Sequence, residues 1–245
     1  MVFQLDDDDI WFPEPIFGED DGLLAVGGDL STERLIMAYS NGIFPWYPYD
    51  ADCPIMWYCP LKRFVIFPDE IHISHSMRTL LNKHTYRVTW DKDFDGVIHG
   101  CATVSQRNVT EGAWLGDDMI EAYTRLHREG ITHSVEVWDG DKLVGGLYGE
   151  RIGNAFCGES MFSLVPSASK LALIFLARKM QAEGVAIIDC QFETPHLASM
   201  GGKFITYNHY MTLLTGHEYT TLDLDDYPPP KGKRGLSPND RFGLK

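Results

Sequence analysis

Three polar side chains stand inside otherwise apolar, strand-like runs: Glu159, Asp189 and Gln191. A carboxylate in such a run needs a partner, because an unpaired charge in a low dielectric is costly. That partner can be a structural arginine or a cationic substrate, and a carboxylate beside an amide is often purely structural. The same pair can also orient a group that takes or shares a proton. The residue types alone leave both interpretations open.

The segment from 154 to 191 reads as a strand, a helix and a second strand that would position these side chains. The first strand carries Glu159, and apolar residues recur at helical spacing from Leu171. A unit of this kind brings its two strands into one sheet. Asp189 and Gln191 are two positions apart, so on a strand they point to the same face. We therefore expect the three side chains to face one cleft.

Capping residues, apolar periodicity and turn signals predict the elements around this unit. Helices are expected at 31–40, 74–83, 94–101, 117–130, 194–200 and 207–214, and strands at 63–67, 86–90, 133–138 and 142–150. Asp139-Gly140 is a hairpin turn signal. Residues 1–21 read as an irregular, acidic and proline-rich lead, and 103–110 as a polar loop.

The bulk composition is that of a globular protein with a substantial core. The chain has 245 residues, of which 44% are hydrophobic, and no apolar run reaches the length of a membrane helix. Its opening residues lack the basic and apolar regions of a signal peptide, so we expect a cytoplasmic protein. The net charge of −14 argues against tight, non-specific nucleic-acid binding, although it allows a local basic patch.

Metal and disulfide chemistry find little support in the sequence. The five cysteines form no Cys-x-x-Cys pair, and free cysteine packs as a small apolar residue. His72 and His75 invite a metal interpretation, but no third ligand has suitable spacing. We expect no metal and no cofactor.

Two further patterns are typical of nucleic-acid contacts, each with a plainer alternative. Aromatic residues on the proline-constrained loop at 42–46, which includes Trp46, can stack on a base or form a small core. Arg78, Lys83 and Arg87 cluster on one predicted helix and the next strand. They are suited to phosphate contacts, or they form a solvated helix face. Residues 162–170 contain no glycine run that would cradle a pyrophosphate.

Taken together, the motifs resemble those of the leucyl/phenylalanyl-tRNA–protein transferase family. The matching stretches run from about residue 10 to 215. They are Gly22-Leu-Leu-Ala-x-Gly-Gly-Asp-Leu30, Gly42-Ile-Phe-Pro-Trp46, Glu111-Gly-x-Trp114, His133-Ser-x-Glu-Val-Trp138, Leu143-Val-Gly-Gly-x-Tyr-Gly149, Phe156-Cys-Gly-Glu-Ser-Met-Phe-Ser163, Ala168-Ser-Lys170 and Ile188-Asp-Cys-Gln191. So many ordered motifs are far more specific than any single one.

The resemblance implies an α+β fold. It consists of a GNAT-like acyltransferase domain with a mainly antiparallel central sheet flanked by helices, plus a small N-terminal α/β domain. We expect the small domain at 1–62, the catalytic domain at 63–217 and a mobile tail at 218–245. The implied reaction moves Leu or Phe, less readily Met, from aminoacyl-tRNA to the α-amino group of an N-terminal Arg or Lys of an acceptor protein. This marks the acceptor for degradation and requires neither a metal nor a membrane.

The resemblance also implies roles for individual residues. Asp189 and Gln191 would be the catalytic pair, with Asp189 orienting Gln191, and Gln191 hydrogen-bonding the attacking amine. Glu159 would contact the basic acceptor. The other substrate-binding residues would be Trp46 and Trp114 for the terminal adenosine, and Leu147, Gly158, Leu173, Leu176 and Ile188 around the transferred side chain. Arg78, Lys83 and Arg87 would meet the tRNA backbone, contacts that position without reading sequence.

Two other functions remain as competing hypotheses. A coenzyme A-dependent N-acyltransferase of the same fold predicts a glycine-rich loop before Ala168, and the sequence has none there. A non-catalytic RNA-binding module needs the aromatic residues and the basic patch. It does not need Glu159, Asp189 and Gln191 together.

Overall fold

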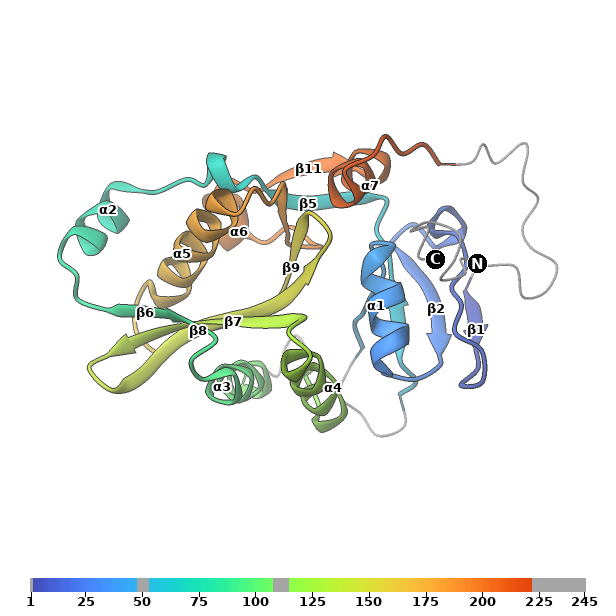
Figure 1. The fold of residues 1–245 in the computed structure, drawn as a ribbon, viewed down its shortest axis with the longest axis horizontal. Helices are drawn as coiled ribbons and strands as arrows, with labels where there is room; N and C mark the ends of the chain where they lie inside the picture. Colours follow the sequence, from blue (N-terminus) through green and yellow to red (C-terminus); the bar gives the residue numbers. More distant parts are fainter. Residues whose placement is uncertain (1, 48–52, 108–114, 222–245) are drawn as a thin grey trace.

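The computed structural model describes residues 2–47, 53–107 and 115–221 of this chain (Figure 1). Within these ranges the protein is a mixed α/β structure with two sheets and seven α-helices. No helix in the described ranges combines the length and apolarity needed to cross a membrane. The predicted tail at 218–245 lies outside the described residues from 222 onward.

The larger sheet has seven strands in the order β11-β5-β10-β9-β8-β7-β6. All neighbouring strands are antiparallel except β9 and β10, which are parallel. The mainly antiparallel sheet that we predicted is therefore present. Its strands are β5 (Lys62–Ile66), β6 (Arg87–Trp90), β7 (Thr132–Asp139), β8 (Lys142–Ile152), β9 (Ala155–Ser163), β10 (Ile187–Asp189) and β11 (Lys203–Thr206).

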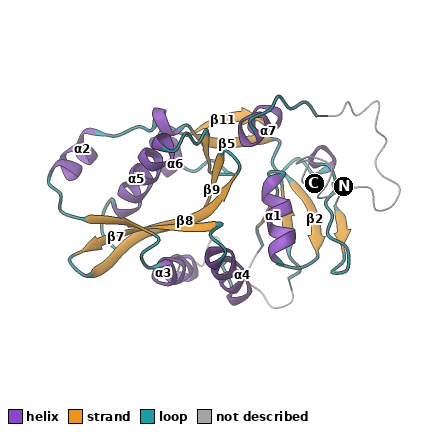
Figure 2. Cartoon of the chain, viewed as in Figure 1, coloured by secondary structure: helices purple, strands orange, loops and turns teal. Residues whose placement is uncertain are grey.

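Helices cover both faces of this sheet (Figure 2). Helix α5 (Ala168–Ala182) packs on one face against β7 and β8, whereas α3 (Phe94–Arg107) and α4 (Asp117–Arg128) lie on the other. Helix α5 connects β9 to its parallel neighbour β10, with Ala155 opposite Ile187 and Cys157 opposite Asp189. The predicted strand–helix–strand unit is confirmed.

The smaller sheet has the order β1-β2-β4-β3 and lies beside helix α1 (Thr32–Ser40). Ser31 caps α1 as predicted, because its side chain accepts a hydrogen bond from the Arg34 backbone N–H. The strands are β1 (Phe3–Leu5), β2 (Leu23–Gly27), β3 (Phe44–Pro45) and β4 (Met56–Tyr58). The boundary predicted at residue 62 stays a prediction.

Five further elements complete the described chain. They are the short helices α2 (His75–Asn82), α6 (Pro195–Ser199) and α7 (Tyr207–Thr215), and two 3-10 turns at Pro15–Phe17 and Pro68–Glu70. Ser74 and Thr194 cap α2 and α6 as predicted. All three α-helices agree with their predicted positions.

Three local predictions were wrong, and short strands such as β11 were missed. The lead segment contributes β1, which pairs in parallel with β2, and β11 was not predicted at all. Both are short edge strands with weak sequence signals. Helix α3 continues to Arg107, into the predicted polar loop, whose residues 108–110 lie outside the described residues. Gln191 lies beyond the end of β10 with a φ of 56°, so it does not share a strand face with Asp189.

A β-bulge places Glu159. Tyr148 pairs with Ser160 and Gly149 pairs with Gly158, so Glu159 is an extra residue with no partner on β8. Bulges re-aim side chains and often lie beside functional sites. A Cβ at Gly149 would lie 2.0 Å from the Cys157 carbonyl oxygen, which is impossible without moving one strand. Glycine at this position therefore permits the bulge.

We predict that Gly149→Ala destabilises the protein by about 1–3 kcal/mol, the usual cost of forcing extra atoms into a packed site. Denaturant unfolding measures the loss. Gly158→Ala is the matched control on the facing strand, because its Cβ would meet no atom closer than 3.6 Å. Equal destabilisation by both variants would contradict the steric role of Gly149.

Candidate active site

A buried ion pair between Arg63 and Asp189 lies at the centre of the structure. Arg63 Nε is 2.9 and 3.1 Å from the two carboxylate oxygens, and its Nη2 is 2.7 Å from Oδ2. Both side chains are buried, and the Tyr210 hydroxyl donates a third bond to Oδ2 at 3.0 Å. The guanidinium also lies over the Phe44 and Tyr210 rings at 4.8 and 4.7 Å. The sequence left open whether the partner of a buried carboxylate is a structural arginine or a cationic substrate. For Asp189 the partner is the structural arginine Arg63.

Asp189 positions Gln191 through the backbone. The Gln191 N–H donates to Asp189 Oδ1 at 2.9 Å, which stabilises the left-handed conformation of Gln191. The Gln191 carbonyl accepts from the Phe64 N–H at 3.3 Å, so β5 holds the same residue. Hydrogen bonds thus hold both the backbone N–H and the carbonyl of Gln191. Its side-chain amide points to Glu159, and Nε2 donates to Glu159 Oε1 at 3.3 Å. The three predicted residues therefore form one connected group.

Glu159 is half-buried and receives hydrogen bonds from neutral donors. The Tyr123 hydroxyl donates to Oε2 at 3.1 Å, and Tyr123 in turn is 2.8 Å from the Tyr39 hydroxyl. Burial raises the pKa of Glu159 to about 7, and the donors Tyr39, Glu150 and Tyr123 oppose that rise. A carboxyl group with this pKa changes charge near neutral pH.

The predicted substrate-binding residues that lie in the described ranges line one cavity of about 760 Å³. Its wall includes Leu147, Gly158, Leu173, Leu176 and Ile188, with Glu159 and Gln191 at the same surface. A largely apolar cavity with a few polar groups is typical of a small-molecule site. The structure therefore brings together residues from β8, β9, α5 and β10 that the sequence analysis assigned to one pocket.

An aromatic cluster forms another part of the cavity wall. Trp46 is 43% exposed, and its ring lies 5.4 Å from Tyr58 and 5.2 Å from Phe192. Phe192 also contacts Phe44 at 5.7 Å and lines the cavity. Sequence analysis missed Phe192, although it directly follows Gln191. Trp114, the second aromatic residue that was predicted to contact the terminal adenosine, lies outside the described residues.

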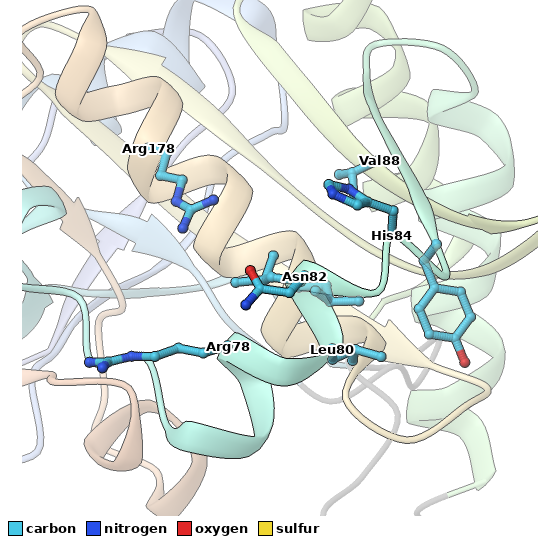
Figure 3. Close-up of a pocket in the computed structure, with 9 residues that line it drawn as sticks. Arg78, Leu80, Asn82, His84, Val88 and Arg178 are labelled. Carbon is cyan, nitrogen blue, oxygen red and sulfur yellow. The ribbon is translucent and has the colours of Figure 1, made fainter.

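A separate hollow of about 450 Å³ lies between α2, β6 and α5 (Figure 3). Arg78 and Asn82 from α2 and Arg178 from α5 surround it, together with His84. Of the three predicted backbone-binding residues, only Arg78 lines this hollow. Lys83 and Arg87 are exposed nearby in the chain, and the Arg87 guanidinium lies 5.0 Å from the Trp138 ring. Arg178 was not predicted to take part.

Within the described ranges, no group of three or more His, Cys, Asp or Glu side chains is arranged to hold a metal ion. The polar groups of the cavity are instead a carboxyl, an amide, hydroxyls, one thiol and one imidazole, that of His196. Such groups are suited to positioning an amine and handling its proton.

Sequence comparison identifies the family. Residues 65–215 match the family described as leucyl/phenylalanyl-tRNA protein transferase, and residues 28–61 match its N-terminal domain. The chain belongs to this family of aminoacyltransferases. The resemblance inferred from the motifs is therefore confirmed.

Curated members of this family are similar over most of their length. The leucyl/phenylalanyl-tRNA–protein transferase of Syntrophus aciditrophicus is 51% identical over 84% of this chain and 84% of its own. The transferase of Thermodesulfovibrio yellowstonii is 49% identical over 87% of this chain and 86% of its own. A solved structure of a conserved protein of unknown function from Bacteroides thetaiotaomicron aligns at 11% identity over 71% of this chain and 62% of that chain. Its TM-score of 0.41 is too low to support a fold assignment.

We predict that Asp189→Ala lowers the free energy of unfolding by about 3–5 kcal/mol, because it leaves the Arg63 charge buried without its partner. Tyr210→Phe removes one hydrogen bond to the same carboxylate and is expected to cost about 0.5–1.5 kcal/mol. Urea titration of both variants measures the difference. If Asp189→Ala cost no more than Tyr210→Phe, the ion pair would not be the main constraint at this site.

Proposed function

We propose that the protein transfers Leu or Phe, less readily Met, from aminoacyl-tRNA to the α-amino group of an N-terminal Arg or Lys of acceptor proteins. The product carries a new peptide bond and is marked for degradation. Membership of the leucyl/phenylalanyl-tRNA protein transferase family is the observation that carries this proposal. Because aminoacyl-tRNA is a cytoplasmic substrate, we place the protein in the cytoplasm.

The cavity is suited to the donor. Leu147, Leu173, Leu176 and Ile188 provide an apolar surface for the side chain of the transferred amino acid. A pocket of this kind separates neighbouring apolar side chains by only about 1–3 kcal/mol, which is consistent with acceptance of more than one amino acid. The exposed Trp46 ring, supported by Phe192, offers a stacking surface for the terminal adenosine.

The polar end of the cavity is suited to the acceptor. Glu159 would attract the basic N-terminal residue, and the Gln191 amide would hydrogen-bond the attacking amine. Asp189 acts through the backbone of Gln191 and not through its amide. Positioning supplies much of the rate when an amine attacks an activated ester, and no metal is required.

Cationic residues outside the cavity would hold the tRNA. Arg78, Lys83 and Arg87 are the proposed backbone contacts, and they lie on α2, the turn after it and β6. We propose that the chain divides into a small domain at 1–62 and a GNAT-like catalytic domain at 63–217. The mainly antiparallel sheet with helices on both faces supports this assignment.

Transfer of radiolabelled Leu and Phe from charged tRNA tests the function directly. We expect label on peptides that begin with Arg or Lys, and none on a matched peptide that begins with Ala. Labelling from acyl-coenzyme A would instead favour the alternative acyltransferase. Binding of tRNA without any transfer would favour an RNA-binding module.

Trp46→Ala is expected to raise the apparent KM for aminoacyl-tRNA by about five-fold or more, because one base-stacking contact contributes about 1–3 kcal/mol. The KM for the peptide acceptor should change little. Steady-state kinetics with each substrate varied in turn separates the two constants. An unchanged KM for aminoacyl-tRNA would show that Trp46 does not contribute to donor binding.

A further inference from the structure

Strand β9 loses one of its two neighbouring strands halfway along its length. Its parallel pairing with β10 covers residues 155–157, and β10 ends at Asp189. On the other side, pairing with β8 continues to Ser163. The burial of β9 changes at the same point, because residues 155–157 are buried and residues 158–161 are partly exposed. From Gly158 onward, β9 is therefore an edge strand on the side where β10 had been.

The backbone after β10 turns away from β9. The Cys190 N–H donates to the Phe64 carbonyl of β5 at 2.9 Å, and the Phe64 N–H donates to the Gln191 carbonyl at 3.3 Å. The two parallel strands therefore separate beyond Asp189. Residues from both sides of this separation line the 760 Å³ cavity, namely 158–163 of β9 and 190–192 after β10. The free edge of β9 is thus part of the cavity wall.

The register with β8 determines which backbone groups of β9 face the cavity. Directly after β9, the Leu164 N–H donates to the carbonyl of Val144, the residue opposite it on β8, at 2.8 Å. Hydrogen-bonded pairs alternate along antiparallel strands, and the register is regular between this pair and the bulge. Phe162 therefore directs its N–H and carbonyl to β8. Met161 and Ser163 direct theirs to the opposite side, toward the cavity.

Met161 and Ser163 have main-chain groups that the rest of the described chain does not use. Among the described residues, no backbone group forms a hydrogen bond with either of them on the cavity side. Each offers one N–H donor and one carbonyl acceptor there. Such an edge is a template for pairing with an extended chain. At about 3.3 Å per residue, the stretch from Gly158 to Ser163 has room for about five residues of that chain.

The charge of the cavity favours a polypeptide as the occupant of this edge. Its described wall includes the Glu159 carboxyl and neither lysine nor arginine. A nucleic-acid strand would bring phosphates to this wall without a positive charge to meet them, and it lacks the alternating N–H and carbonyl groups of a β-strand. A polypeptide with a basic first residue carries its positive charges at its N-terminus, where Glu159 attracts them.

The proposed reaction also requires binding that ignores most side chains. An enzyme that acts on many proteins with the same first residue has to hold the residues that follow without reading them. Main-chain hydrogen bonds to a strand edge provide affinity of this kind, because every residue except proline has the same N–H and carbonyl groups.

Resting on the proposed function, we propose that the first residues of the acceptor bind as an added strand on the free edge of β9, in the place and direction that β10 would have continued. The α-amino group lies at Glu159 and Gln191, so the acceptor runs parallel to β9 toward Ser163. The Met161 N–H then donates to the carbonyl of the acceptor's first residue, and the Met161 carbonyl accepts from the N–H of its third residue. The N–H groups of the second and fourth residues point away from β9.

N-methylated acceptor peptides test this alternation. In a pentapeptide that begins with Arg, N-methylation of the third residue removes a hydrogen bond and places a methyl group against β9. The apparent KM for the peptide should rise by about five-fold or more. N-methylation of the fourth residue is the matched control, because its methyl group points away from β9, and it should change the KM by less than about two-fold. Equal effects of the two peptides would overturn the added strand.

Amide hydrogen exchange, followed by NMR on the full chain, gives a readout that needs no transfer. In the free protein, the N–H groups of Met161 and Ser163 should exchange faster than that of Phe162, which is directed to β8. A saturating concentration of the unmethylated Arg-pentapeptide should slow exchange at Met161 and Ser163 by about ten-fold or more. The Phe162 N–H is the internal control and should be unaffected.

The two readouts separate this proposal from the proposed function. Protection of Met161 and Ser163 without any transfer would overturn the function and support the peptide site on β9. Transfer to the Arg-pentapeptide without protection of these two N–H groups would overturn only the added strand. The absence of both transfer and protection would overturn both.

Discussion

The buried pair of Arg63 and Asp189 is the interaction on which the rest of the site depends. It joins β5 to β10, receives the Tyr210 hydroxyl from α7 and places the Arg63 guanidinium against Phe44 of the smaller sheet. A buried charge without its partner is expensive, so neither residue can be lost alone. Because the Asp189 carboxylate also accepts from the Gln191 backbone, the ion pair determines where the cavity's amide lies.

The carboxyl groups around the cavity are held in different ways. Asp189 is neutralised by an arginine, whereas Glu159 is met by hydroxyl and amide donors, and Glu150 by the Thr132 hydroxyl. The first arrangement produces a buried ion pair that serves as a support. The second produces a carboxyl that can exchange a proton near neutral pH. The bulge at Glu159 makes this possible, because it turns the side chain out of the regular alternation of β9.

Helix α5 divides the cavity from the basic hollow. Ser169, Leu173 and Leu176 line the cavity, while Leu171 and Arg178, two helical turns apart, line the hollow. A single rigid element thus presents an apolar face to the proposed aminoacyl group and a cationic side chain to the region of the proposed tRNA contacts.

The sequence by itself determined the family and most of the helices. Caps at Ser31, Ser74 and Thr194 and the apolar periodicity of α5 are local signals, so the corresponding helices were predictable. The ordered motifs determined the family and a set of cavity residues. They give the residue types of the site and their order along the chain, but not their positions in space. Tertiary structure alone decided which groups meet. Arg63 lies 126 positions from Asp189, and no local pattern links them. The left-handed turn at Gln191 is held by Asp189 and, at its carbonyl, by Phe64 of the distant strand β5. The bulge at Glu159 forms only where β9 pairs with β8.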